Sequence, residues 1–397
     1  MAEQHEKALV PQIRFAGFTD PWEQRKLGEL FEEHSEKDRD DLPALTIIQG
    51  GGTVHRDESN RNLQFDRNSL SNYKVVDTGD FIVHLRSFEG GLEKATCCGL
   101  VSPAYHIFRG KNVDSDFYYL YFRSKRFIDA DLKPHVYGIR DGRSIDIEGM
   151  KTIFIPWTNL AEQRRIGAFF DHLDSLITLH QRKYDKLCVL KKSMLDKMFP
   201  KGGSLYPEIR FAGFTDPWEQ RKLGELFEES DERASDREIL SVSVANGIYP
   251  ASESDRETNP GASLANYKVV HSGDVVYNSM RMWQGAVDAS RYDGIVSPAY
   301  VVAKPNSEVY ARFFARLLRQ PMLLKQYQQV SQGNSKDTQV LKFDDFASIE
   351  ISMPASENEQ RQIGAFFDRL DSLITLHQRK LELLRNIKKS MLDKMFV

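Results

Sequence analysis

Two long stretches of nearly the same sequence constrain this chain more than any other feature. Residues 162–199 and 359–396 are identical at 30 of 38 positions, contain no proline and carry one glycine each, near the start. Apolar residues recur in both at alternating spacings of three and four, which predicts a helix with one apolar seam. A helix of this length spans about 57 Å. Because no compact domain needs such a helix twice, we interpret the two stretches as paired spacer helices.

The seam residues expected to pair the two helices lie in the same phase in both copies. They are Ile166, Phe170, Leu173, Ile177, Leu187 and Met194 in the first copy, and Ile363, Phe367, Leu370, Ile374, Leu384 and Met391 in the second. Two like halves in one chain favour isologous pairing about a pseudo-two-fold axis. With that axis perpendicular to the helices, they form an antiparallel coiled coil with one body at each end. A parallel pairing would instead place both bodies at the same end.

A second repeat indicates that the whole chain is a duplication. Residues 11–33 recur as residues 207–229 with 22 of 23 positions identical, so each half has a shared block, a variable body and a shared helix. This repeat is far longer than a solenoid unit and is typical of a duplicated domain. We predict a first domain at residues 1–159, a helix at 160–199, a linker at 200–206, a second domain at 207–358 and a helix at 359–397.

Each body alternates short apolar runs with Gly, Asn and Asp, which is typical of strands and turns. The expected elements are strands at 44–48, 73–76, 80–85, 104–108, 152–155 and 349–353, and helices at 115–130 and 309–318. In the shared block, Asp20 is expected to cap a short helix that begins at Pro21. The fold class is therefore α+β, with two similar mixed α/β domains separated by two long helices.

The composition excludes several classes of protein. A net charge of −3 and a pI near 6.4 give no global basic signature, so any nucleic-acid site must be a local patch. Three cysteines without zinc-ligand spacing suit a reducing compartment. The N-terminus has no apolar leader and no stretch approaches about eighteen apolar residues, so we expect a cytoplasmic protein without membrane contact.

Sequence signatures of catalysis are absent. There is no phosphate loop, no dinucleotide-binding glycine motif, no H-E-x-x-H zinc motif and no nucleophile elbow. We therefore predict no catalytic residue, no metal site and no enzymatic activity of this chain alone.

Corresponding loops of the two halves combine Arg, Lys, Asn, Gln and aromatic residues with Gly and Ser. Arg and Lys suit guanine edges, and Asn and Gln suit adenine edges. The candidate DNA-binding residues are Arg86, Ser87, Lys94, Tyr137, Arg140 and Arg143 in the first half, and Asn278, Arg281, Trp283, Gln284 and Lys336 in the second. The alternative reading, that these are ordinary polar surface loops, is the more frequent one for any single residue. The corresponding placement in both halves favours DNA binding.

The chain resembles the specificity (S) subunit of type I restriction–modification systems over essentially its whole length. The likeness is carried by Gly17-Phe-Thr-Asp-Pro-Trp-Glu, by the Gly-Asp pairs at 79 and 273, by Ser-Pro-Ala-Tyr at 102 and 297, and by the Glu-Gln-Arg starts of the long helices at 162 and 359. The resemblance implies two target-recognition domains that each read one half of a split, asymmetric site on double-stranded DNA, with the helices fixing the gap.

The resemblance also implies the partners. Two methyltransferase (M) subunits would dock on the chain and use S-adenosylmethionine to methylate adenines, and restriction (R) subunits would add ATP- and Mg²⁺-dependent cleavage. No cofactor would be bound by this chain itself. Two other hypotheses stay open: a coiled-coil protein-interaction scaffold without DNA recognition, and a self-sufficient nuclease or methyltransferase.

Overall fold

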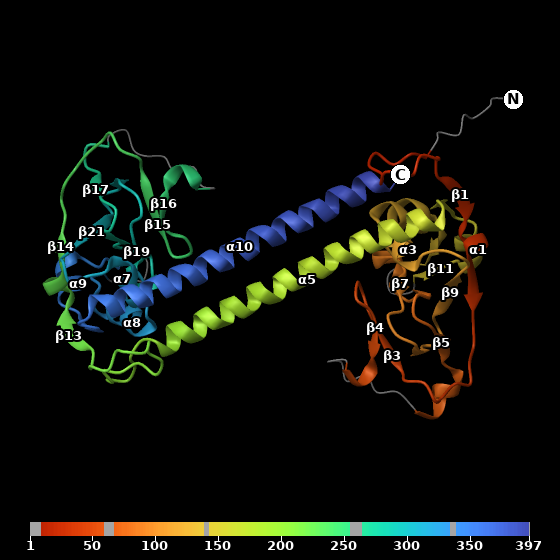
Figure 1. Cartoon of the computed structure of the whole chain (residues 1–397), viewed down its shortest axis with the longest axis horizontal. Helices are drawn as coiled ribbons and strands as arrows, with labels where there is room; N and C mark the ends of the chain where they lie inside the picture. Colours follow the sequence, from red (N-terminus) through yellow and green to blue (C-terminus); the bar gives the residue numbers. More distant parts are fainter. Residues whose placement is uncertain (1–8, 59–66, 139–142, 255–263, 334–338, 397) are drawn as a thin grey trace. The chain divides into compact units, whose positions relative to one another are not determined.

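The chain folds into two compact units, each of which includes parts of both long helices. The computed structural model describes residues 9–58, 67–138, 143–254, 264–333 and 339–396. Unit 1 comprises Met1–Gln181 and Arg379–Val397, and unit 2 comprises Arg182–Gln378. The long helices are α5 (Leu160–Lys197) and α10 (Glu357–Met395), labelled in Figure 1. Among the described helices, none is long and apolar enough to cross a membrane.

Unit 1 is built on a four-stranded antiparallel sheet in the order β2-β9-β6-β7. Three two-stranded ladders and the pairing of β1 with β12 surround it. The strands are β1 (Glu23–Lys26), β2 (Phe31–His34), β3 (Leu45–Ile48), β4 (Gly52–His55), β5 (Lys74–Val76), β6 (Phe81–Val83), β7 (Glu93–Lys94), β8 (Gly99–Val101), β9 (His106–Gly110), β10 (Val136–Tyr137), β11 (Ser144–Ile145) and β12 (Phe154–Trp157).

The helices of unit 1 are short apart from α5. They are α1 (Leu27–Leu30), η1 (Arg56–Glu58), η2 (Arg67–Asn72), α2 (Ser87–Gly90), α3 (Ser115–Phe122), the π-helical turn η3 (Phe127–Leu132), η4 (Lys133–His135) and α4 (Ile147–Lys151). The edge-to-face rings of Phe31, Phe81 and Tyr118 fill the core between the sheet and α3.

Unit 2 repeats this plan with the sheet order β14-β21-β18-β19. Its strands are β13 (Glu219–Lys222), β14 (Phe227–Glu229), β15 (Leu240–Ser243), β16 (Gly247–Pro250), β17 (Lys268–Val270), β18 (Val275–Asn278), β19 (Val287–Ala289), β20 (Gly294–Val296), β21 (Tyr300–Pro305) and β22 (Glu350–Met353). Its shorter helices are α6 (Leu223–Leu226), η6 (Ala251–Glu253), η7 (Met282–Gln284), α7 (Ala311–Leu317), α8 (Pro321–Val330) and α9 (Phe343–Ala347).

The prediction of a helix starting at Pro21 is wrong. The residues after Trp22 form strand β1, whose backbone pairs with β12, and the helix is delayed to the single turn α1. The strand forms because the last strand of the body offers a free edge, which the local sequence does not reveal. Trp22 itself is buried in the unit 1 core, as expected of a docking residue.

Two further predictions in the first body need correction. The helix expected at 115–130 ends at Phe122, and a separate π-helical turn follows, where the Ser124 hydroxyl accepts a hydrogen bond from the Phe127 N–H at 3.1 Å. The strand expected at 152–155 lies at Phe154–Trp157, because Thr152 ends the helix α4.

The two long helices run antiparallel where they meet, which confirms the predicted coiled coil. In unit 1, Lys388 contacts both carboxylate oxygens of Asp174 at 2.6 and 2.8 Å, and Arg385 donates to Gln181 at 3.1 Å. Residue numbers therefore rise along α5 as they fall along α10. In unit 2, Lys191 pairs with Asp371 at 2.5 Å in the corresponding way.

The seam residues of α5 and α10 serve the domain cores as well as the helix pair. Ile166, Phe170 and Leu173 are buried in the unit 1 core, together with α10 residues that include Met395. Equivalently, Ile363, Phe367 and Leu370 are buried in the unit 2 core with Met198 and Phe199, which directly follow α5. The remaining seam residues are half-buried; they are Ile177, Leu187, Met194, Ile374, Leu384 and Met391. Each unit is thus completed by the helix end of the other half of the chain.

The predicted linker between the two halves, residues 200–206, contains a hydrogen-bonded turn. Ser204 N–H donates to the Lys201 carbonyl at 3.0 Å, and Trp218 N–H donates to the Leu205 carbonyl at 2.9 Å. Gly202 and Gly203 have φ of 60° and 81°, a conformation that other residues adopt only with strain.

Candidate nucleic-acid interface

One surface loop occupies the same place in both units and carries an arginine at the same position. In unit 1 it connects β6 to α2, and in unit 2 it connects β18 to η7. Arg86 precedes α2 with φ −116° and ψ 14°, and Arg281 precedes η7 with φ −127° and ψ 14°. A glycine with positive φ caps the short helix that follows each loop, Gly91 at 79° after α2 and Gly285 at 93° after η7. The sequence repeat does not cover these loops, so their backbones match although their side chains differ.

In unit 1, Arg86 is exposed, and its guanidinium makes no hydrogen bond or ion pair with the described residues. Its neighbour Leu85 is 68% exposed. Ser87, which the sequence placed among the candidates, is fully buried and accepts a hydrogen bond from the His84 N–H at 2.9 Å. Its hydroxyl therefore holds the loop in shape and does not reach the surface.

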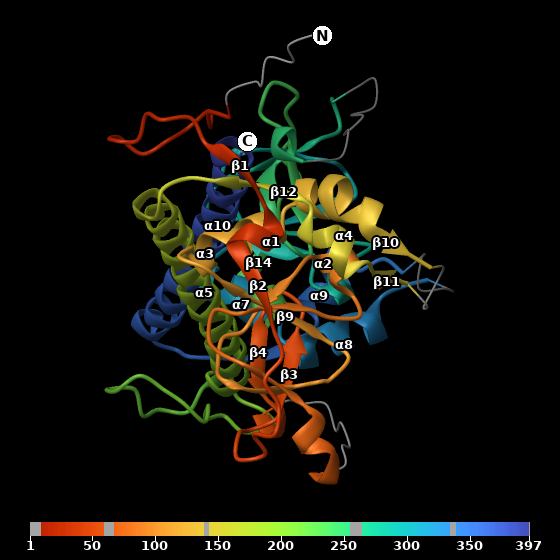
Figure 2. The ribbon, with the colours of Figure 1, turned by 90° about the vertical axis from the view of Figure 1, so that its right-hand side faces the viewer.

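The hairpin β10–β11 lies against this loop in unit 1 and enlarges its surface. Arg143 stacks over the ring of Phe88 at 4.1 Å and contacts Glu89 at 3.3 Å. Tyr137 on the other strand is 59% exposed. Figure 2 shows the two strands projecting beside α4. Arg140 lies outside the described residues.

The corresponding surface of unit 2 is held by its own backbone. Asn278 Oδ1 accepts from the Met280 N–H at 3.0 Å, and Trp283 Nε1 donates to the Met280 carbonyl at 3.2 Å. These two candidates therefore shape the loop. Arg281 and Gln284 are exposed, and their side chains make no hydrogen bond within the described part of the chain.

A second hairpin also flanks the loop in unit 2. Gln332 and Val340 pair as a bridge, and the Leu341 N–H donates to the Ser279 carbonyl at 2.9 Å. Lys336 lies outside the described residues. Both units thus set one arginine-bearing loop against one hairpin.

Lys94 does not join the others. It forms an ion pair with Asp116, its side chain is 18% exposed, and burial lowers its pKa. The sequence missed two residues that do lie on the surface, Leu85 and Met280, which is 45% exposed. Each directly precedes the loop arginine. An exposed apolar side chain beside a strand end was the available signal, and it suits contact with a thymine methyl group.

A buried carboxylate fixes the surroundings of the unit 1 loop. Glu93 is fully buried, accepts hydrogen bonds from the Gly50 N–H at 2.7 Å and the Tyr119 hydroxyl at 2.9 Å, and pairs with Arg123. It thereby ties the tip of the β3–β4 hairpin to α3. No local sequence pattern marks this cluster, because its members come from distant segments.

A second buried carboxylate attaches the start of α5 to the unit 1 body. Arg14 donates from Nε and Nη2 to the two oxygens of Glu162 at 2.6 and 2.8 Å, and Trp22 Nε1 donates at 3.2 Å. Burial acts to raise the pKa of Glu162, but the hydrogen bonds from Arg14 and Thr158 outweigh it and hold that pKa below its ordinary value.

Unit 2 repeats this attachment at the start of α10. Arg210 donates to both oxygens of Glu359 at 2.7 and 2.8 Å, and Trp218 Nε1 donates at 3.4 Å. In both units the arginine comes from the shared block, so the near-identity of the two blocks has a structural reason. Each body is clamped to its long helix by the same buried ion pair.

No group of three or more His, Cys, Asp or Glu side chains that could hold a metal ion occurs in the described residues. The fold and the paired loops therefore define a class of protein, in which two like mixed α/β units with differing surface loops are built on two long antiparallel helices.

Comparisons with known proteins agree with this class. Residues 215–386 match the family model of the type I restriction modification DNA specificity domain. The structure of a type I restriction–modification system S subunit from M. genitalium aligns with a TM-score of 0.57 at 15% identity, over 98% of this chain and 99% of that one. The HsdS subunit from Thermoanaerobacter tengcongensis aligns with a TM-score of 0.44 at 16% identity, over 96% and 98%. The family model covers part of the second half of the chain, and the alignment with the M. genitalium S subunit shows a shared fold over nearly the whole chain.

Proposed function

We propose that each unit reads one half of a split, asymmetric site on double-stranded DNA through its arginine-bearing loop. The observation that carries this proposal is the pair Arg86 and Arg281, which have the same backbone conformation and exposed guanidiniums. An arginine donates two parallel hydrogen bonds to the O6 and N7 of guanine, which no other base offers in the same geometry. The neighbouring side chains differ between the units, so the two half-sites would differ in sequence.

The long helices would set the gap between the half-sites and hold the partner subunits. The ion pairs of Glu162 and Glu359 support this role, because they leave each helix start no freedom to turn against its body. Apolar side chains also remain exposed along both helices, among them Leu179, Leu190, Leu376 and Leu383. Exposed apolar stripes on helices favour helix-on-helix docking. Two methyltransferase subunits would dock there.

Catalysis would belong to the partners. The methyltransferase subunits would use S-adenosylmethionine to methylate adenines, and restriction subunits would use ATP and Mg²⁺. The chain would contribute the choice of sequence and the assembly platform.

A genome-wide adenine-methylation map of the host, with and without this gene, tests the proposal. We expect one split motif to lose its methylation on deletion and to regain it when the gene is restored. An unchanged map, in a host whose methyltransferase subunit is expressed, would contradict the proposal and favour an interaction scaffold.

A further inference from the structure

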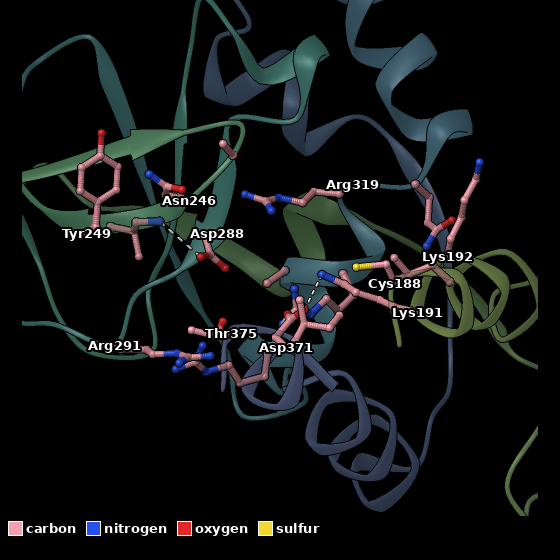
Figure 3. Close-up of a pocket in the computed structure, with 18 of the residues that line it drawn as sticks. Cys188, Lys191, Lys192, Asn246, Tyr249, Asp288, Arg291, Arg319, Asp371 and Thr375 are labelled. Atoms are coloured by element: carbon pink, nitrogen blue, oxygen red, sulfur yellow. Dashed lines mark hydrogen bonds and ion pairs between the residues drawn. The ribbon is translucent and has the colours of Figure 1, made fainter. Parts of the chain in front are cut away.

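Unit 2 contains a basic cavity that the recognition loop does not use. Its volume is about 1150 Å³, which is slightly above the upper end of the usual range for ligand pockets, about 1000 Å³. It lies between the β15–β16 hairpin, β19, α7 and the two long helices (Figure 3). Six of its lining side chains are basic and four are acidic.

The two carboxylates that form ion pairs with the cations of this cavity are each shared by more than one cation. Asp368, which lies just behind the lining, is shared by three guanidiniums, those of Arg291, Arg312 and Arg316, at distances of 3.4, 3.9 and 2.9 Å. Asp371 is shared by Arg316 at 2.7 Å and Lys191 at 2.5 Å. Two carboxylates therefore serve four cations.

Among the described residues, Arg319 has no carboxylate partner within ion-pair distance. Its Nε donates to the Val287 carbonyl at 2.8 Å, and its Nη2 is buried without a hydrogen bond to the described residues. In Figure 3 its guanidinium points toward Asn246 and Asp288. Asp288 is already engaged, because it accepts from the Ile248 N–H at 3.3 Å and the Ala289 N–H at 2.9 Å. Arg316 Nε is also buried and unpaired in the described structure.

Both the burial and the mutual repulsion of these groups disfavour their charge. Burial lowers the pKa of Arg319, and burial with the nearby charge of Arg291 lowers the pKa of Arg312. A buried N–H left without an acceptor costs about 1–3 kcal/mol, and more when the group is charged. The arrangement is therefore one that an added anion would stabilise.

Unit 1 provides an internal comparison, because the same positions there are neutralised. Asp116 of unit 1 and Arg312 of unit 2 occupy equivalent positions against the long helices. A Cβ added at Gly167 of α5 would lie 2.9 Å from the Cβ of Asp116, and a Cβ added at Gly364 of α10 would lie 3.2 Å from the Cβ of Arg312. One turn further on, Leu120 stands where unit 2 has Arg316.

The arginine of unit 1 that corresponds to Arg319 is also neutralised. It is Arg123, and it pairs with the buried Glu93. Unit 2 has Arg312 where unit 1 has Asp116, and Arg316 where unit 1 has Leu120. These two differences make the net charge of unit 2 more positive by three at this place.

We propose that this cavity of unit 2 binds a small phosphate-bearing molecule with two or more negative charges. Guanidiniums donate in parallel pairs to phosphate oxygens, and several arginines converging on one space suit a multiply charged anion. The volume leaves room for an organic group attached to the phosphate. This proposal stands apart from the DNA-reading role and would survive its failure.

Isothermal titration calorimetry of the purified full chain with sodium triphosphate tests the proposal, with sodium chloride of equal ionic strength as the blank. We expect saturable one-site binding. The variant Arg312→Asp/Arg316→Leu, which copies the residues of unit 1, should bind at least tenfold more weakly. Arg319→Gln provides a second variant with the same expected loss and with the Asp368 ion pairs retained.

Three outcomes would overturn the proposal. The first is a heat of titration no greater than in the chloride blank. The second is equal triphosphate affinity of the native chain and both variants. The third is a variant that loses affinity for a short DNA duplex although triphosphate binds to neither the native chain nor the variant. The last outcome would assign the cavity to DNA phosphates. The proposed DNA-reading role is judged independently, because the methylated motif should be unchanged in both variants.

Discussion

The buried carboxylate of Glu162 attaches the start of α5 to the body of unit 1. Its side chain is fully buried and takes both hydrogen bonds of Arg14. Breaking a buried ion pair from one side costs about 3–5 kcal/mol, because the remaining charge keeps its desolvation penalty. We expect Arg14→Met to lower the free energy of unfolding of unit 1 by about this amount, as measured by urea denaturation.

The double variant Arg14→Met/Glu162→Leu separates the ion pair from general packing. It removes the orphaned charge, so it should recover a large part of the loss. An equal loss in the single and double variants would show that the charge is not the cause. Arg210→Met is the matched variant in unit 2, where the same pair is formed by Glu359.

The lowered pKa of Glu162 predicts how the stability of unit 1 depends on pH. A carboxylate whose pKa is lower in the folded state stabilises the fold above its unfolded pKa, about 4.3. This contribution is lost as the pH falls through the folded pKa. We therefore expect unit 1 to lose stability below about pH 4.3. Glu162→Gln should be less stable at neutral pH, and its stability should fall less in acid. Denaturation curves recorded between pH 3 and 7 measure this difference. A variant whose free energy of unfolding depends on pH as steeply as that of the native chain would contradict the reasoning.

The far ends of the long helices are structural parts of the opposite half's unit. Phe199, the last aromatic residue of the first half, is 3% exposed and contacts Trp218, Phe313 and Phe367 in unit 2. Phe396 occupies the same place in unit 1, against Trp22 and Phe117.

Truncation of Phe199 should therefore destabilise the unit formed mostly by the second half. Removing a buried phenylalanine side chain costs about 3–5 kcal/mol. We expect Phe199→Ala to lower the protection of unit 2 amides in hydrogen exchange and to leave unit 1 amides unchanged. Phe396→Ala should show the opposite pattern with a smaller loss, because Phe396 is only half-buried. Loss confined to unit 1 in the first variant would contradict this assignment.

The sequence predicted the elements that carry their own periodicity or repeat. The duplicated seam predicted α5 and α10, and the paired segments predicted one architecture in both halves. The short helices α4 and α9 were missed, because five residues give no helical period. The antiparallel sheets were not predictable in order, since β2 pairs with β9 across more than seventy residues.

For the candidate surface, the sequence placed Arg86 and Arg281 in corresponding loops that mix polar and aromatic residues, and both arginines are exposed. It could not separate them from Ser87 and Lys94, which are adjacent or near in the chain but are buried or paired. Burial is decided by distant partners such as Asp116, which local composition does not show.

The duplication as a whole makes a prediction about DNA binding by the complete chain. If each unit reads one half-site, a substitution in one loop should change recognition of that half alone. A good arginine–guanine contact contributes about 1–3 kcal/mol of discrimination. We therefore expect Arg86→Ala to relax sequence preference in one half of the methylated motif and Arg281→Ala to relax it in the other, as read by sequencing of methylated sites.

The salt dependence of affinity distinguishes a base contact from a phosphate contact at the same two residues. A lost phosphate contact lowers the slope of log affinity against log salt by about one, whereas a lost base contact leaves the slope unchanged. We expect unchanged slopes and relaxed preference for both single variants, measured with duplexes that carry the methylated motif. Because the two loops belong to different compact units, the double variant should show the sum of the two losses within about 0.5 kcal/mol. A reduced slope with intact preference would place the arginines on the DNA backbone, and the half-site reading would then have to come from Leu85, Met280 and the hairpins beside them.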